Sequence, residues 1–175
     1  MLCRGGTVPG HAVLLAGVPP LEDWVRERTA HYDAGFVSAD PAFAHAHVTV
    51  LAPFPLEARG PAAAIASGVS AFDVSLARVD VFPDGVVHLV PEPDDGFRAL
   101  TDAARRLLPD VQPYWGRFEP VPHLTLDRLG PGVTVESTRD AVAHLLPARA
   151  RVTELLLTWW ESGDCRVLGR FPLRS

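Results

Sequence analysis

The protein is a chain of 175 residues, 47% of them hydrophobic, with a formal net charge of −5. This length and apolar content predict a single domain or two small lobes sharing a core, and they exclude a disordered chain. The acidic balance argues against a protein that grips long nucleic acid through a broad basic surface, and it leaves room for a small or terminal phosphate substrate in a local pocket.

The first part of the chain predicts alternating strands and helices. Hydrophobic periodicity and turn residues indicate, in order, a strand at 11–18, a helix at 21–32, a strand at 45–51 stopped by Pro53 and Pro55, a helix at 61–71, and strands at 72–81 and 85–91. The last two strands are joined by Pro83-Asp84-Gly85, a sequence typical of a tight turn, so they predict a hairpin.

The second part continues with a helix and more hairpins. The pattern predicts a helix at 95–108 that ends at Pro109, a loop at 110–122, a strand at 123–128, a helix at 134–146, and closing strands at about 151–160 and 165–173. Hairpins are too frequent in this order for a doubly wound parallel sheet. We therefore predict an α+β fold with largely antiparallel sheets.

A missing residue type excludes several chemistries. All 16 basic residues are arginine, and the chain has no lysine. The chain therefore cannot use a Walker A lysine, the lysine–nucleotidyl intermediate of ATP-dependent ligases, or a Schiff base to pyridoxal phosphate.

Cysteine usage and the early apolar run bear on the compartment. Cys3 and Cys165 lie near opposite ends and form no CxxC pair, so we expect a reduced cytoplasmic protein and disfavour a clasp between them. The run at 12–18 is closed by two prolines and predicts a strand, not a signal peptide. No apolar stretch is long enough to span a membrane.

One short phrase occurs twice, as His47-Val48-Thr49-Val50 and as His123-Leu124-Thr125-Leu126, 76 residues apart. Each phrase alternates polar and apolar residues, which predicts a half-buried strand with His and Thr on one face and the aliphatic residues in a core. If the two strands meet across a cleft, two imidazoles can divide general-base and general-acid work, and two hydroxyls can donate hydrogen bonds to an anion. The repeat thus predicts a site that cuts a phosphodiester without a metal.

The sequence around the two phrases resembles the two-histidine phosphoesterase superfamily, which includes the bacterial 2′-5′ RNA ligase family and cyclic phosphodiesterases. The residues that carry the resemblance are HVTVLAPF (47–54) and FEPVPHLTLDR (118–128), with further likeness at FPDGVVHLVPE (82–92) and RVLGRFPL (166–173). The resemblance implies a bilobal α+β fold with antiparallel sheets around a central cleft and helices outside. We expect one such domain over residues 1–175, with one motif in each lobe.

The resemblance also implies residue roles. In the family the motif histidines act as acid and base and the motif threonines hold the phosphate, which carries over to His47, His123, Thr49 and Thr125. The family needs no metal, and its substrates include 2′,3′-cyclic phosphates, ADP-ribose 1″,2″-cyclic phosphate and 2′-5′-linked oligonucleotides. Some members join tRNA halves without ATP. We therefore expect a metal-independent phosphodiesterase without cofactors, a monomer whose partner is a nucleotide or an RNA 3′ end.

Four further residues are candidate substrate contacts. Tyr114 and Trp115 precede the second motif and could stack a base or cap the core. His45 shares the face of His47, and a solvated strand-end histidine is favoured over a position at the rim of the site. An arginine at the place of Arg128 is frequent in the family, but strand parity directs it away from His123, which favours a structural ion pair.

Other residues carry weaker signals. A metal held by His45, His47 and His123 is disfavoured because neither phrase contains a carboxylate. Three more arginines are alternative phosphate ligands, namely Arg78, Arg117 and Arg170. Four histidines follow no pattern and are predicted to be surface or satisfied core residues, namely His11, His31, His88 and His144.

Two other functions stay open. The chain could be an RNA-end or nucleotide-binding protein without turnover, in which case binding would be insensitive to histidine replacement. It could also be a phosphodiesterase for a non-nucleotide small molecule, which substrate competition would reveal.

Overall fold

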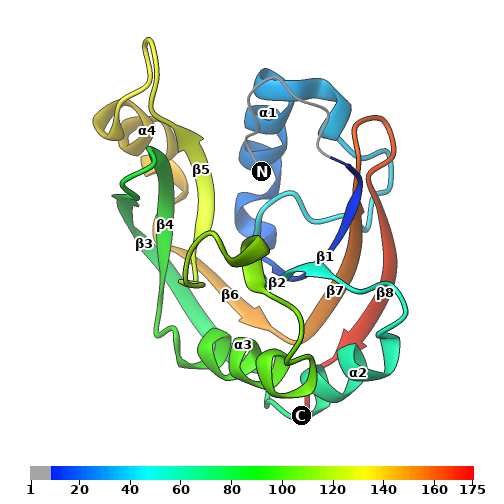
Figure 1. The fold of residues 1–175 in the computed structure, drawn as a ribbon. Helices are drawn as coiled ribbons and strands as arrows, with labels where there is room; N and C mark the ends of the chain where they lie inside the picture. The colour runs from blue at the N-terminus through cyan, green and yellow to red at the C-terminus, as the bar shows by residue number, and fades with distance from the viewer. Residues whose placement is uncertain (1–8) are drawn as a thin grey trace.

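The computed structural model describes residues 9–175 (Figure 1). Its strands are β1 (His11–Gly17), β2 (His47–Phe54), β3 (Phe72–Val81), β4 (Val86–Glu92), β5 (Leu124–Arg128), β6 (Ala148–Val152), β7 (Glu154–Trp160) and β8 (Arg166–Pro172). Its α-helices are α1 (Glu22–Asp33), α2 (Arg59–Ser67), α3 (Asp95–Leu107) and α4 (Val135–Val142). Short 3-10 helices lie in the connections, at η1 (Pro19–Leu21), η2 (Ala34–Phe36), η3 (Pro113–Gly116) and η4 (Ala143–Leu145).

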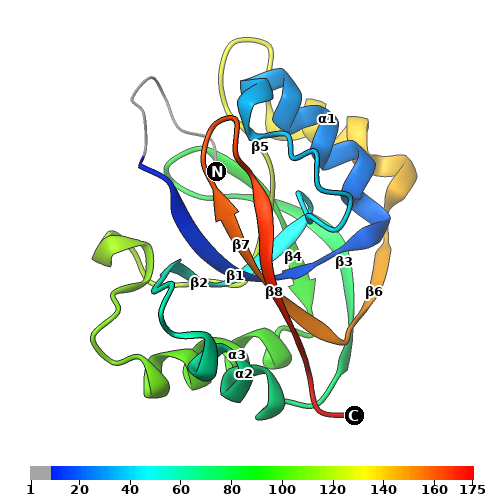
Figure 2. The ribbon, with the colours of Figure 1, turned by 90° about the vertical axis from the view of Figure 1, so that its right-hand side faces the viewer.

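The strands form two four-stranded sheets, with the orders β2-β1-β7-β8 and β5-β4-β3-β6. Neighbouring strands are antiparallel in both sheets, which confirms the predicted α+β class. Figure 1 shows the two sheets facing each other, and Figure 2 shows α2 and α3 side by side below them. The first sheet contains β2 and the second contains β5, so each sheet carries one of the two repeated phrases.

One hydrophobic core joins the two sheets and the helices. It includes Leu14 of β1, Ile65 of α2, Leu89 of β4, Phe97 of α3 and Leu124 at the start of β5. The aliphatic residues of the repeated phrases are buried as predicted, since Val48, Val50, Leu124 and Leu126 are at most 3% exposed. Burying each such side chain contributes about 1.5–3 kcal/mol, so the alternation in each phrase fixes which face of the strand turns to the core.

A smaller apolar cluster lies on the other face of the first sheet. Val13 and Leu15 of β1 pack there with Phe43, Leu156 and Trp160. Leu15 pairs with Thr49 in the β1–β2 ladder, and cross-strand partners lie on the same face of a sheet. This cluster therefore lies on the face that carries the polar residues of the first phrase.

Two predicted element boundaries in the last third of the chain are wrong. The strand predicted at 151–160 is two strands, β6 and β7, which pair with β3 and β1 in different sheets because the chain crosses between the sheets at Thr153. The helix predicted at 134–146 ends at Val142 and is followed by η4. Pro147 disfavours helical backbone at the preceding residue, so the helix cannot run on.

Two boundaries in the first half also differ from prediction. β2 continues through Pro53 to Phe54, which the fold tolerates because β2 is an edge strand and one side of it needs no ladder hydrogen bonds. The helix predicted at 61–71 spans Arg59–Ser67, and the backbone N–H of Gly68 closes its last turn.

Cys165 is a buried free thiol, whereas Cys3 lies outside the described residues. Among residues 9–175, no helix has both the length and the apolar content needed to cross a membrane.

Candidate active site

The two repeated phrases lie at the junction of the two sheets. His47 and Thr49 are on β2, and His123 immediately precedes β5, which carries Thr125. β2 and β5 contact each other although they belong to different sheets. A positive charge on His123 lowers the pKa of His47, so the two imidazoles interact electrostatically.

Each motif histidine is held by an equivalent hydrogen bond to the backbone carbonyl two residues earlier. Nδ1 of His47 lies 2.8 Å from the carbonyl oxygen of His45, and Nδ1 of His123 lies 2.7 Å from that of Val121. A carbonyl only accepts, so Nδ1 carries the proton in both rings and donates it. Nε2 is therefore the nitrogen of each ring that is available to a substrate.

Burial sets the protonation state of these rings. It lowers the pKa of His47 to about 4, and the charge of His123 acts in the same direction. Burial also lowers the pKa of His123, opposed by the hydrogen bond to Val121 and assisted by the charge of His88. Both imidazoles are thus neutral near pH 7, and a bound anion would raise the pKa of each.

The aromatic rings of Trp160 and Phe43 pack beside His47. The Trp160 ring lies 5.2 Å from the His47 ring, centroid to centroid, at 51°. The Phe43 ring packs against the Trp160 ring with centroids 4.7 Å apart, and both residues belong to the smaller apolar cluster on this face of the first sheet. These contacts restrict the rotation of the His47 ring.

His88 and Phe82 support His123 in a comparable way. The β4–β5 ladder places His88 opposite Thr125, on the face that carries the second motif. The His88 ring lies 5.5 Å from the His123 ring, and Phe82 stacks on His88 at 3.9 Å while meeting His123 edge-on at 4.9 Å. The sequence gives His88 no visible role, because the partner of a strand residue depends on register between distant segments.

The loop before the second motif brings Tyr114 and Trp115 to the first motif. The Tyr114 side chain interacts with the Thr49 side chain, and burial raises the Tyr114 pKa to about 12. Trp115 meets His11 of β1 edge-on at 5.3 Å. Tyr114 and Trp115 have φ values of 50° and 56°, a left-handed conformation that costs non-glycine residues about 1–2 kcal/mol each.

The expectation that His45 is a solvated strand-end residue is wrong. His45 is 4% exposed, Nδ1 donates to Glu22 at 2.6 Å, and Nε2 accepts from the backbone N–H of Ser38 at 3.0 Å. The Glu22 carboxylate also accepts the backbone N–H groups of His45 and Ala46, at 3.1 and 2.9 Å. Glu22 thereby fixes the peptide whose carbonyl orients His47.

The parity argument for Arg128 fails because β5 contains a bulge. The register pairs His88 with Thr125 but Val87 with Asp127, so one extra residue of β5 lies between these pairs. Arg128 then pairs with Val86 and shares the strand face of Thr125. Its guanidinium donates to the carbonyl of Asp84 at 2.8 Å and lies 3.6 Å from the Asp84 carboxylate, so it is anchored at the turn of the β3–β4 hairpin.

The same bulge turns Asp127 into the interior, where it is 3% exposed. Arg28 of α1 donates from Nη2 to both carboxylate oxygens, at 2.8 and 2.7 Å, and Tyr32 also bonds the carboxylate. Thr138 of α4 donates to it at 3.2 Å. This network ties α1 to the strand of the second motif.

The other candidates lie in simpler settings. Arg78 is paired with Asp80 and Glu92, Arg170 is paired with Glu154, and Arg117 lies 5.9 Å from the Trp115 ring. His31 and His144 are exposed, whereas His11 and His88 are buried beside the site. In residues 9–175, no three histidine, cysteine or acidic side chains form a group that could hold a metal ion.

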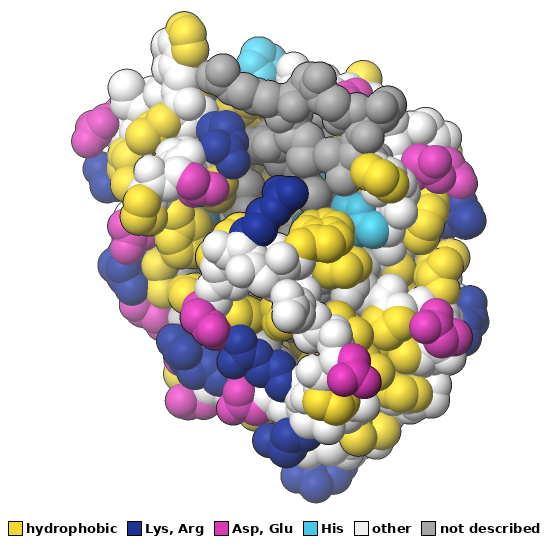
Figure 3. All heavy atoms as spheres, viewed as in Figure 1, with side chains coloured by type: hydrophobic (Ala, Val, Ile, Leu, Met, Phe, Trp, Pro, Cys, Tyr) yellow, Lys and Arg dark blue, Asp and Glu magenta, His cyan; other side chains and the backbone are white. Residues whose placement is uncertain are grey.

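One face of the described surface carries charges of both signs. On the face seen in Figure 3, arginine side chains are interspersed with aspartates and glutamates, with one small group of basic side chains at the lower left and no broad basic area. That pattern suits recognition of a localised phosphate, not a long backbone.

Comparison with known proteins agrees with this architecture. A sequence model of the 2′-5′ RNA ligase superfamily matches residues 18–164. The structure of Escherichia coli LigT complexed with 3′-AMP is 20% identical with a TM-score of 0.60, and the match covers 96% of this chain and 100% of LigT. TT0787 of Thermus thermophilus is 19% identical with a TM-score of 0.60, covering 94% of this chain and 98% of that one.

A third solved structure, described as a phosphoesterase, is 17% identical with a TM-score of 0.57, and the match covers 96% of this chain and 100% of that one. The curated proteins contain no match. These structural likenesses confirm the predicted fold, the bilobal arrangement of the two-histidine phosphoesterases.

Proposed function

Since the chain belongs to the 2′-5′ RNA ligase superfamily, we propose that it cleaves or exchanges nucleotide phosphodiesters that involve a 2′-oxygen. Family membership supports a phosphoesterase activity. The two-histidine mechanism, its independence of metals and the nucleotide substrate are the specific parts of the proposal.

The observation that carries the proposal is the matched pair of histidine tautomers. His47 and His123 each donate Nδ1–H to a carbonyl two residues earlier and keep Nε2 for the substrate. They come from strands of different sheets that contact each other. One ring can therefore serve as base and the other as acid on opposite sides of one phosphorus atom.

In the hydrolysis of a 2′,3′-cyclic phosphate, the base takes a proton from water as its oxygen attacks phosphorus in line. The bond from phosphorus to one ribose oxygen breaks, and the acid gives that oxygen a proton, leaving a phosphomonoester. We assign the base to His47, whose pKa of about 4 keeps Nε2 unprotonated, and the acid to His123. When a 5′-hydroxyl replaces water as the nucleophile, the same steps form a phosphodiester.

Thr49 and Thr125 are proposed to donate hydrogen bonds to the non-bridging oxygens as negative charge grows on them. Arg128 supports this role because the bulge places it on the face of Thr125. Tyr114 and Trp115 would hold the sugar or base beside Thr49, since the loop brings both rings to the first motif. His45 is removed from the candidate substrate contacts, since its ring is engaged by Glu22 and Ser38.

The nucleotide class of substrate has support from the solved relatives. Escherichia coli LigT has been crystallised with 3′-AMP, with NADP+ and with phosphate. All three contain the phosphate group that the two motifs are proposed to bind.

The test is turnover of 2′,3′-cyclic nucleotides and 2′-5′ dinucleotides in EDTA, with wild type beside His47→Ala and His123→Ala. Each replacement should lower kcat by about 10² to 10⁴, the usual effect of losing a general acid or base. His144→Ala, which removes an exposed histidine, is the matched control and should retain wild-type turnover.

Full activity in both motif variants would overturn the mechanism. Binding without turnover, unchanged in the variants, would identify a nucleotide-binding protein. If a non-nucleotide diester is cleaved and outcompetes the nucleotides, the substrate is not a nucleotide, although the two-histidine mechanism would still hold.

A further inference from the structure

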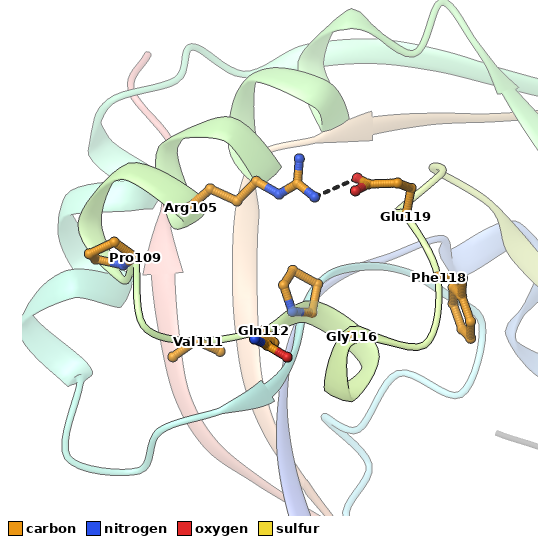
Figure 4. Close-up of a pocket in the computed structure, with 8 residues that line it drawn as sticks. Arg105, Pro109, Val111, Gln112, Gly116, Phe118 and Glu119 are labelled. Atoms are coloured by element: carbon orange, nitrogen blue, oxygen red, sulfur yellow. Dashed lines mark hydrogen bonds and ion pairs between the residues drawn. The ribbon is translucent and has the colours of Figure 1, made fainter.

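A cavity of about 580 Å³ lies beside the loop that precedes the second motif, where no expected substrate contact was placed (Figure 4). Its lining comes from the end of α3 and the segment that follows, and comprises Arg105, Pro109, Val111, Gln112, Pro113, Gly116, Phe118 and Glu119. We call this cavity the loop pocket. Its volume falls in the range of pockets that bind small molecules and cofactors, about 300–1,000 Å³.

The lining of the loop pocket mixes polar and apolar groups and has no net charge. Arg105 and Glu119 form an ion pair at 2.6 Å across one side, as Figure 4 shows, so the two charges cancel. Gln112 adds a carboxamide with both donor and acceptor groups. This chemistry suits a flat, uncharged ring with hydrogen-bonding edges, and it does not suit a phosphate.

Phe118 supplies an open aromatic surface. It stacks on Tyr114 with centroids 4.4 Å apart at 28°, and it is still 54% exposed. One face of the ring is thus covered by Tyr114, while much of the rest is open to a ligand. Exposed aromatic rings of this kind are the platforms on which single-stranded nucleic acids stack their bases.

A chain of contacts leads from the catalytic residues to the loop pocket. Thr49 interacts with Tyr114, Tyr114 stacks on Phe118, and Phe118 lines the pocket. The turn η3 separates the two spaces, and a Cβ added to Gly116 would lie 2.7 Å from Oε1 of Gln112. The turn is therefore packed closely against the end of the Gln112 side chain.

We propose that the loop pocket binds the base of a nucleotide next to the one that reacts, so that the substrate is an RNA end and not a mononucleotide. The flanking base stacks on Phe118, and its edge meets Gln112 and the Arg105–Glu119 pair. This inference rests on the proposed function and narrows its substrate class.

The test compares two substrates with the same reacting group: adenosine 2′,3′-cyclic phosphate, and the dinucleotide ApA ending in a 2′,3′-cyclic phosphate. Wild type should prefer the dinucleotide at least about fivefold in kcat/KM, the scale expected when one base stacks on an aromatic ring. Phe118→Ala should abolish that preference by raising KM for the dinucleotide, with mononucleotide turnover unchanged. Phe118→Trp should restore the preference, and Gln112→Ala should reduce it.

Leu107→Ala is the matched control, because Leu107 is an exposed apolar residue of α3 outside the pocket lining. Equal kcat/KM for the two substrates in wild type would overturn the inference, and so would an equal loss on both substrates in Phe118→Ala. The second outcome would mean that Phe118 supports only Tyr114. Absence of turnover on every diester would instead contradict the proposed function, which separates the two failures.

Discussion

At the scale of single residues, the site orients its histidines with neutral partners. Nδ1 of His11, His47, His88 and His123 lies 3.4, 2.8, 3.2 and 2.7 Å, respectively, from the carbonyl two residues earlier in the chain. A carboxylate in that place would stabilise the imidazolium and raise its pKa, whereas a carbonyl does so much less. The backbone thus fixes each ring while burial keeps its pKa low.

This electrostatic setting predicts an acidic pH optimum. With His47 as base, kcat/KM should rise as pH increases through about 4, because protonated His47 cannot accept a proton. With His123 as acid, kcat/KM should fall again above a pKa that lies below the ordinary histidine value of about 6.5, because deprotonated His123 cannot donate. The check is kcat/KM for a cyclic nucleotide, measured from acidic pH below the His47 pKa to mildly alkaline pH.

The same experiment separates the assignments. His47→Ala should lose the acid limb and keep the alkaline limb in its residual rate, and the reverse should hold for His123→Ala. A wild-type maximum at alkaline pH would contradict the assignment, since both pKa values lie below the ordinary histidine value.

The buried face of each motif strand could be predicted from the sequence because the information is local. A period of two predicts which side chains share a face, and Val48 and Leu124 are buried as that rule requires. His88 could not be found in this way. Its importance comes from lying opposite Thr125, and the register between β4 and β5 is set by packing far from either residue.

At the scale of elements, the loops and helices between strands contribute residues to the site as the strands do. Arg128 shows the limit of sequence reasoning, since a one-residue bulge reverses the face that simple alternation predicts. The boundary between β6 and β7 shows another limit. The run from 148 to 160 is continuous in the chain, and only the pairing partners divide it between two sheets.

The first turn of α1 provides an element-scale prediction. Burial opposes ionisation of Glu22, but hydrogen bonds from His45 and from the backbone of His45 and Ala46 outweigh it and lower the Glu22 pKa. A carboxyl with a lowered folded-state pKa stabilises the fold above its unfolded value of 4.5, and that stability is lost as pH falls through the folded value. Glu22→Gln should therefore lower the free energy of unfolding by about 1–3 kcal/mol at neutral pH.

Urea unfolding at a series of pH values measures this effect, and the gap in unfolding free energy between wild type and Glu22→Gln should shrink as pH falls from the unfolded value of 4.5 through the lowered pKa of the folded state. Asp23→Asn is the control, because Asp23 is the exposed acidic neighbour on the same turn. A gap that stays constant from neutral to strongly acidic pH would show that the carboxylate charge is not what stabilises this connection.

At the scale of the whole molecule, the proposed catalysis by one histidine from each sheet requires the sheets to keep a fixed separation. The shared hydrophobic core supplies most of that rigidity, since it contains residues of both sheets and of α2 and α3. The Arg28–Asp127 ion pair adds a specific link between the two sheets. Arg28 lies on α1, which follows β1 of the first sheet, and Asp127 lies on β5 of the second sheet, two residues beyond Thr125.

Replacing Arg28 with Ala should test that link, because it leaves a buried carboxylate without a charged partner, with Tyr32, Thr138 and the backbone N–H of Arg128 as its remaining donors. We expect a loss of about 2 kcal/mol in the free energy of unfolding, less than the roughly 3–5 kcal/mol of a fully buried pair because Arg28 is partly exposed. Adding Asp127→Ala in the Arg28→Ala background should recover part of the loss, since no charge then stays buried. Arg98→Ala, which breaks an exposed pair with Asp94, is the control and should leave the free energy of unfolding nearly unchanged.

The link should also be visible in catalysis under conditions where the variant is fully folded. If Arg28 and Asp127 set the distance between the two motifs, Arg28→Ala should lower kcat more than it raises KM, because the acid and base must be aligned together only in the transition state. The double variant, although more stable than Arg28→Ala, should not regain kcat. Recovery of both stability and kcat in the double variant would mean that the shared core alone aligns the two histidines.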